Sequence, residues 1–213
     1  MNIKKYIPKE IVLIMLLALF LNTLRIVLFD SRSFVWLFWN LFLAVVPFVI
    51  SSFLLIYDDK NRLTKTSFFF FGFFWLLFIP NAPYLVTDLI HIGVVRSVPV
   101  IYDSFLLFSV AWLGVYLGVY SINHIDQILK KRYTKKFSEV VIFFIILFIS
   151  FGIYMGRFLR FNSWDIFKEP LSLIKKTHIT FVYPKDYNTY LYIALFAIFV
   201  YIFYRSFKYI KER

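Results

Sequence analysis

Long apolar runs alternate with short polar segments along the chain, and their length predicts helices that cross a membrane. An α-helix needs about 20 apolar residues to span the hydrocarbon core of a bilayer. We expect six transmembrane helices, at about residues 11–29, 34–56, 67–86, 104–122, 140–159 and 190–207. The third is predicted to break near Pro80, because proline cannot donate the hydrogen bond that continues a helix. The pattern therefore predicts an all-α polytopic membrane protein, with residues 1–213 forming a single membrane domain.

Composition strengthens this prediction and excludes several kinds of site. Apolar residues make up 61% of the chain, whereas about 45–50% is usual in soluble domains. The sequence has no cysteine, which excludes disulfides, thiolate metal sites and cysteine nucleophiles. The net charge of +12 would suggest nucleic acid as a partner of a soluble protein. Here most Lys and Arg flank apolar runs, so we predict contact with the lipid bilayer and its anionic lipids, and no nucleic-acid partner.

The distribution of basic residues predicts the orientation in the membrane. If the N-terminus is cytoplasmic, most of the 24 Lys and Arg residues fall on the cytoplasmic side, as the positive-inside rule requires. Six helices then also place the C-terminus in the cytoplasm. The loops at 80–103 and 160–187 would face outward, and we expect a short helix at the membrane surface in each.

Polar residues at membrane depth gather at the predicted outer ends of the helices. Charged groups near a bilayer are costly, so such a cluster usually has a partner, a water-filled pocket or a function. Asn22, Arg25 and Asn40 lie in outer halves too, where they could line the same pocket or pair with one another. The inner halves are expected to be nearly bare hydrocarbon, with His124 and Asp126 as solvated loop residues.

The first candidate motif is PNAPYLVTDLIH, residues 80–91. Asn81 is expected to cap a helix that starts at Pro83. Helical periodicity then places four polar side chains on one face: Tyr84, Thr87, Asp88 and His91. Asp88 and His91 are three residues apart and form a candidate catalytic acid/base pair. The alternative is a surface helix whose polar stripe meets water while its apolar face lies on lipid.

The second candidate motif is GRFLRFNSWD, residues 156–165. Arg157 and Arg160 suit a phosphate or carboxylate, because a guanidinium can bind either through two hydrogen bonds. The alternative is interfacial anchoring with a salt bridge to Asp88, Asp103 or Asp165. Ser163 and Asp165 are also suited to the cap and first turn of a following helix.

Other residues extend this candidate site. The predicted binding residues, besides the two arginines, are Asn81, Tyr84, Thr87, Asp103, Asn162, Trp164 and Asp165. Asp103 opens the fourth helix, where capping is the simpler explanation. A metal site using Asp88, His91, Asp103 and His178 is a weak alternative, and none is predicted.

Two pairs of glycines, each spaced four residues apart, permit close helix packing: Gly114 with Gly118, and Gly152 with Gly156. They are expected to contact different neighbours, or to meet only near Gly114 and Gly152.

The two motif strings, with Tyr-Asp at 102–103 between them, resemble the uncharacterised bacterial membrane proteins grouped as domain of unknown function 1361. The resemblance implies a multi-pass protein of a bacterial cytoplasmic (cell) membrane. It assigns neither an activity nor a cofactor, and the cofactor stays unknown. It points to the residues that match the two strings as those to test.

Three functions remain open from the sequence. The first is a membrane module whose outward-facing polar pocket binds a lipid, another anionic ligand or a partner. The second is an enzyme acting on a lipid head group or lipid-linked cell-envelope precursor through Asp88, His91, Arg157 and Arg160. The third is a transporter or flippase, which the apolar inner halves disfavour. Common catalytic motifs such as HExxH, G-x-S-x-G and Gly-rich phosphate loops do not occur.

Overall fold

The structure is a computed structural model that describes residues 6–182 and 188–211. These residues form helices and no strands, which confirms the predicted all-α class. In chain order the helices are α1 (Lys9–Phe29), α2 (Trp36–Asp59), α3 (Lys65–Phe78), α4 (Asn81–Tyr84), η2 (Leu85–His91), α5 (Val100–Arg132), α6 (Lys135–Phe158), α7 (Asp165–Lys168), α8 (Pro170–Val182) and α9 (Asn188–Lys211).

Six helical segments of the described chain are long and apolar enough to cross a membrane, in agreement with the predicted number. Segment α3–α4–η2 counts as one of them. The largest difference from prediction is α5, which continues to Arg132 instead of ending near Ile122. Its 33 residues extend about 50 Å, well beyond a hydrocarbon core of about 30 Å.

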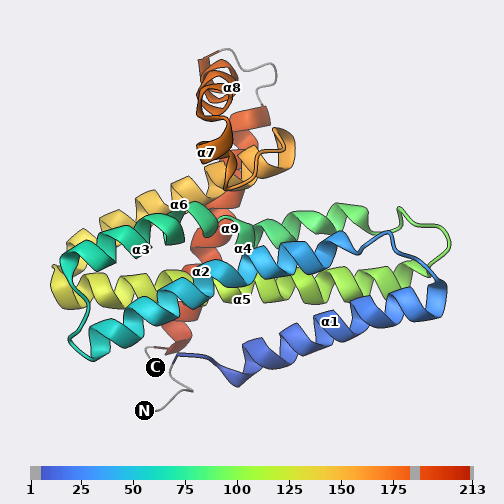
Figure 1. The fold of residues 1–213 in the computed structure, drawn as a ribbon, viewed down its shortest axis with the longest axis horizontal. Helices are drawn as coiled ribbons and strands as arrows, with labels where there is room; N and C mark the ends of the chain where they lie inside the picture. The colour runs from blue at the N-terminus through green and yellow to red at the C-terminus, as the bar shows by residue number, and fades with distance from the viewer. Residues whose placement is uncertain (1–5, 183–187, 212–213) are drawn as a thin grey trace.

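The helix α5 lies at the centre of the bundle. In Figure 1, α1, α2 and α5 run along the longest axis of the molecule, and α9 crosses α5 and α6 obliquely. In the most apolar stretch of α5, 67% of the residues are buried inside the protein, against 22% in that of α1 and 11% in that of α9. The short helices α7 and α8 stack beyond the end of α6 (Figure 1). A polar residue on the inner face of α5 is therefore shielded by protein rather than exposed to lipid.

The third span breaks at Pro80 as predicted, but the restart differs. Helix α4 begins at Asn81, with Pro80 as its N-cap and without a side-chain cap, so the predicted capping role of Asn81 is wrong. Its Nδ2 instead donates to the carbonyl oxygen of Phe78 at 2.8 Å and to Ser163 Oγ at 2.9 Å. Leu85 is fully buried, so this segment packs inside the bundle instead of resting its apolar face on lipid.

Both glycine pairs pack against one segment, residues 80–85, which they enclose from two sides. A Cβ at Gly114 of α5 would collide with the carbonyl oxygen of Ala82, and one at Gly152 of α6 would lie 2.5 Å from Pro80 Cγ. The other two lie next to the same segment: Gly118 at Pro83 and Gly156 at Tyr84. The expectation of different neighbours is therefore wrong. Small residues on α5 and α6 let the broken helix fit tightly between them.

The end of the bundle where α2 ends and α6 begins is called the opposite end below. The prediction that it is bare hydrocarbon is wrong, because His124 is fully buried and Asp126 is 1% exposed. Ser51 Oγ lies 3.2 Å from His124 Nδ1 and hydrogen bonds to Ser121 Oγ at 3.0 Å. His124 and Asp126 belong to the buried face of α5. This face continues past the apolar run from which the helix was predicted.

Asp126 forms a group of close contacts that we call the closed cluster, with Lys130, Ser138 and Lys208. Its carboxylate meets Lys130 Nζ at 2.8 Å and Lys208 Nζ at 3.2 Å, and Ser138 Oγ donates to it at 2.6 Å. These contacts join α5, α6 and α9. Nearby on α2, Asp58 pairs with Arg132 at 2.6 Å. The opposite end therefore contains ionisable groups, contrary to the prediction of an apolar inner half.

Candidate functional site

A cleft of about 980 Å³ opens at the end of the bundle where α2 begins and α6 ends, called the pocket end below. Helix α2 forms one wall and α6 the other. The floor is the α3–α4–η2 segment, and residues of the 160–163 loop, α7 and α8 complete the lining. The glycine contacts described above hold residues 80–85 of this floor between α5 and α6. The polar residues of η2 follow directly on this tightly packed segment.

Most of the predicted site residues line this cleft. They come from two distant parts of the sequence and are Asn81, Tyr84, Asp88, His91, Arg157, Arg160 and Asn162. The 3₁₀ geometry of η2 explains why Asp88 and His91 point the same way, since residues three apart eclipse in that helix. Asn40, from α2, joins them.

Asp88 and His91 both approach Arg157. Arg157 Nη1 lies 3.6 Å from Asp88 Oδ1, and its Nη2 lies 3.5 Å from His91 Nε2. Because a guanidinium only donates, a hydrogen bond here would need Nε2 as the acceptor and the imidazole proton on Nδ1. Asn40 Nδ2 donates to the other Asp88 oxygen at 3.2 Å. The distances to Arg157 are long for charged pairs, so its guanidinium is only loosely engaged.

Asp88 and His91, both within the described part of the chain, do not hydrogen bond to each other; each contacts Arg157 instead. The predicted pairing therefore becomes a three-residue group with Arg157 in the middle.

Arg160 differs from Arg157 in both backbone and surroundings. It adopts a left-handed conformation with φ of 57°, which is uncommon for a residue with a side chain. Its side chain is exposed and lines the cleft. It makes no hydrogen bond or ion pair with other described parts of the chain. The loop thus presents a cation to the cleft without a protein counter-ion.

The rest of the lining is largely apolar and runs along α6 away from the arginines. It includes Phe148, Phe151, Gly152 and Met155 of α6, with Leu43 of α2 opposite. From Arg157 to Phe148 the helix rises about 13 Å, close to half of a hydrocarbon core of about 30 Å. Phe148 is 38% exposed, so the cleft is not sealed along α6.

Tryptophans, not predicted as site residues, form the wall of the cleft on the α2 side. Trp36 packs edge-on against His91 with ring centroids 5.1 Å apart, and Trp39 packs against Trp164 at 6.0 Å. Trp36 and Trp39 line the cleft. Tryptophans are enriched where membrane meets water, and that preference is the signal by which the sequence could have indicated these two.

Three further predicted residues lie beside the cleft rather than in its lining. Thr87 donates to the carbonyl oxygen of Tyr84 at 2.8 Å and is buried in η2. Trp164 supports Trp39. Asp165 begins α7 and accepts from the backbone N–H of Asn162 at 2.7 Å, which holds the loop in place. Ser163 does not cap α7, whose N-cap is Trp164.

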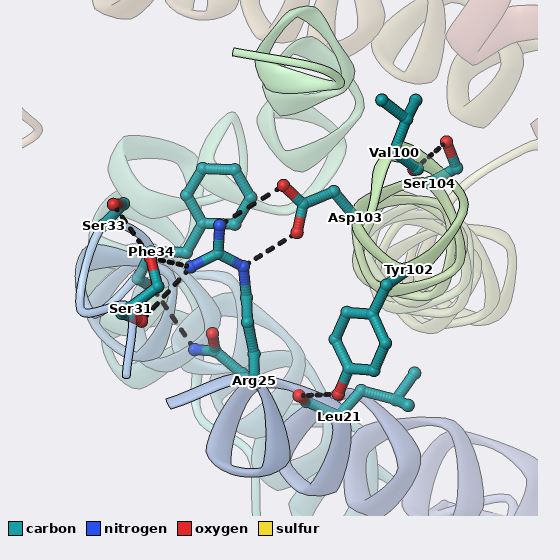
Figure 2. Close-up of polar contacts among 10 residues, drawn as sticks. Leu21, Arg25, Ser31, Ser33, Phe34, Val100, Tyr102, Asp103 and Ser104 are labelled. Atoms are coloured by element: carbon teal, nitrogen blue, oxygen red, sulfur yellow. Dashed lines mark hydrogen bonds and ion pairs between the residues drawn. The ribbon is translucent and has the colours of Figure 1, made fainter. Parts of the chain in front are cut away.

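Asp103 belongs to a separate contact. Helix α5 begins three residues earlier, with Pro99 as its N-cap, so the predicted capping role of Asp103 is wrong. Figure 2 shows Arg25 of α1 reaching the carboxylate with two nitrogens, Nε at 2.7 Å and Nη2 at 3.2 Å. Both side chains are fully buried. The expectation that Arg25 joins the pocket or pairs with Asn22 is therefore wrong as well.

A metal site is not formed by the residues considered for it. Asp103 is occupied by Arg25, away from Asp88 and His91. Across residues 6–182 and 188–211, the structure brings no three His, Asp or Glu side chains together in a way that could hold a metal ion.

The comparison with protein families identifies a match over most of the chain. Residues 39–203 match the family described as protein of unknown function (DUF1361). The chain belongs to this family. The match covers both motif strings and every lining residue of the cleft except Trp36. A search of the curated proteins and a search of the solved structures found no match.

Proposed function

We propose that the cleft binds an amphiphile with an anionic head group, so that this multi-pass membrane protein acts as a lipid-binding module. The observation that carries the proposal is the joint presence of Arg160, a cation without a partner among the described residues, and an apolar channel leading away from it. Asp88, the one carboxylate among the described lining residues, already accepts from Asn40 and faces Arg157. The charged groups left to a ligand are therefore the guanidinium cations of Arg157 and Arg160, which suit phosphate or carboxylate oxygens.

The apolar part of the cleft favours a lipid over a small soluble anion. An acyl chain beside Phe148 and Met155 would extend about as far as one leaflet is deep. A volume of about 980 Å³ is at the upper end of the usual range for ligand pockets, about 300–1,000 Å³. A free phosphate ion would leave most of that space without a partner.

We also propose that the pocket end faces outward and that both termini are cytoplasmic. The distribution of Lys and Arg supports this orientation. The exposed basic residues of the opposite end, such as Lys135 and Lys136, would then meet anionic lipids of the cytoplasmic leaflet.

Native mass spectrometry of the full chain tests the proposal. The protein in detergent is titrated with dioleoyl phosphatidylglycerol, dioleoyl phosphatidylcholine or glycerol 3-phosphate. We expect the anionic lipid to bind most tightly, because the neutral lipid lacks net charge and the soluble head group lacks acyl chains. Tightest binding of glycerol 3-phosphate would indicate a site for a soluble anion. Equal binding of both lipids would contradict head-group recognition.

The double variant Arg157→Ala/Arg160→Ala tests whether the cleft is the binding site. The control is Arg32→Ala/Arg96→Ala, which removes two exposed arginines outside the lining. Charged hydrogen bonds contribute about 1.5–3 kcal/mol each, and about 1.4 kcal/mol is tenfold in affinity. We expect the first variant to bind phosphatidylglycerol at least about tenfold more weakly and the control to bind it like the unaltered protein. Equal losses in both would show that binding follows overall charge instead of the cleft.

A second candidate is an enzyme that acts on such a head group, and it is supported by the convergence of Asp88, His91 and Arg157 in one cleft. In that case the arginine holds the anion while the imidazole or the carboxylate transfers a proton. Incubation with phosphatidylglycerol followed by lipid mass spectrometry would detect turnover. Turnover that is lost in His91→Ala while lipid binding persists would favour the enzyme.

A further inference from the structure

We propose that the buried Arg25–Asp103 pair is a positioning element of the cleft, which acts through Phe34 on the ring of His91. The pair lies outside the cleft lining, and Arg25 belongs to a helix that precedes the family match. Its link to the site is a chain of contacts from α5 through α1 to the segment between α1 and α2.

The first link is between Arg25 and the connecting segment. Arg25 Nη1 donates to the carbonyl oxygen of Ser31 at 3.2 Å and to its hydroxyl at 3.0 Å. The same hydroxyl bonds to Ser33 Oγ at 3.1 Å (Figure 2). Asp103 holds the other side of the guanidinium, so its orientation is set from α5. The fork geometry of arginine makes this arrangement rigid, which a lysine could not reproduce.

The second link is Phe34, which α1 holds in two ways. The guanidinium carbon of Arg25 lies 4.1 Å from the centre of the Phe34 ring, a distance suited to a cation–π contact. Asn22 Nδ2 donates to the carbonyl oxygen of Phe34 at 3.2 Å. Arg25 and Asn22 are fully buried and Phe34 is 3% exposed. Ring and backbone of this residue are thus both fixed from α1.

The third link joins Phe34 to the cleft. Its ring packs edge-on against His91 at 6.3 Å and against Trp36 at 5.7 Å, and these two rings pack against each other at 5.1 Å. His91 and Trp36 line the cleft. A shift of Phe34 would therefore change the direction in which the imidazole faces Arg157.

The energetic balance of the pair fits a geometric role. Removing two charges from water is costly, and apolar replacements of a buried pair are often neutral or stabilising. The pair is thus weak evidence for stability. The hydrogen bonds to Asp103 and Ser31 instead fix the guanidinium of Arg25, which in turn positions the ring of Phe34. A purely stabilising role and a positioning role predict different behaviour when the pair is replaced by apolar side chains.

The test uses histidine-selective ¹⁵N NMR of the full chain in detergent, together with the phosphatidylglycerol titration. The protein has three histidines, and two of them have an aromatic contact of their own. Phe34 packs on His91, and Phe48 packs on His124 at 5.7 Å. Phe48 is 4% exposed and belongs to the same apolar core, so Phe48→Leu is a matched control for Phe34→Leu.

We expect Phe34→Leu to shift the His91 imidazole signals and Phe48→Leu to shift those of His124. The double variant Arg25→Met/Asp103→Leu, which leaves no unpaired buried charge, should also shift His91 and spare His124. Both Phe34→Leu and the double variant should weaken phosphatidylglycerol binding on the order of tenfold, and Phe48→Leu should leave it unchanged.

Unchanged His91 signals in a folded double variant would overturn the proposal. So would equal weakening of lipid binding by Phe34→Leu and Phe48→Leu, since that reports a general loss of stability. The binding readout rests on the proposed lipid-binding function, but the NMR readout does not. If the unaltered protein fails to bind the lipid, the proposed function fails, and the His91 signals still decide the positioning role.

Discussion

The pocket end and the opposite end of the bundle both bury charged side chains, but they hold them differently. In the closed cluster, Asp126 meets Lys130 and Lys208 at 2.8 and 3.2 Å and is 1% exposed. In the cleft, Arg157 lies 3.6 Å from Asp88, and Arg160 is exposed beside it. A charge at membrane depth thus does not by itself mark a ligand site. The proposed binding site rests instead on cations that are held loosely beside open space, Arg157 and Arg160.

The largest effect that separates the two ends is expected from Asp126→Ala. The change leaves Lys208, whose side chain is 8% exposed, without its carboxylate. Removing one member of a buried pair costs about 3–5 kcal/mol, so thermal unfolding in detergent should occur at a clearly lower temperature. The fraction that remains folded should bind phosphatidylglycerol normally. Loss of binding before loss of folding would show that the two ends are coupled.

An intermediate effect is expected at the floor of the cleft from Gly152→Ala. The new methyl group would press on Pro80, and overpacking typically costs about 1–3 kcal/mol. The control is Gly72→Ala, where the added methyl group meets nothing within 4 Å. It should be neutral or slightly stabilising. Chemical denaturation of both variants measures the difference, and equal stabilities would contradict the tight packing of residues 80–85.

The smallest effect is expected from Asp88→Asn. This variant tests whether the Asp88–Arg157 contact at 3.6 Å is as weak as its length indicates. Asparagine keeps an acceptor for Asn40 but no longer competes with an anionic ligand for Arg157. The long contact with Arg157 offsets little of the cost of burying this carboxylate, which is 1% exposed. Stability should therefore change little, and phosphatidylglycerol should bind about two- to fivefold more tightly, a difference of about 0.4–1 kcal/mol. Weaker binding would mean that the carboxylate itself orients the lipid. Loss of lipid turnover with binding retained would favour the enzyme.

The helices and much of the cleft follow from local sequence signals. An apolar run of about 20 residues is a strong signal for a spanning helix, and Pro80 marks the break correctly. Asp88, His91, Arg157 and Arg160 were found because each motif places polar groups where an apolar run ends, at spacings that bring them to one side.

The predictions that were wrong concern residues whose partners lie far away in the chain. Asp126 was expected to be solvated because a polar stretch after an apolar run resembles a loop, and Lys208 on α9 gives no local sign that it pairs with it. Asp103 resembles a helix cap until α1 brings Arg25 across 78 positions. The shared target of the glycine pairs was missed for the same reason, since spacing shows that a helix can approach closely but not which neighbour it approaches.

The separation of Asp88 and Arg157 along the chain also sets an order of assembly during synthesis. Chains grow at about 5–20 residues per second, so the arginine is made about 3–14 s after the carboxylate. In that interval Asn40, made earlier, is available to hydrogen bond to Asp88. A nascent chain that has completed α5 but not α6 therefore carries the floor of the cleft and the carboxylate of Asp88. It still lacks the wall formed by α6, which supplies the positive charge of Arg157.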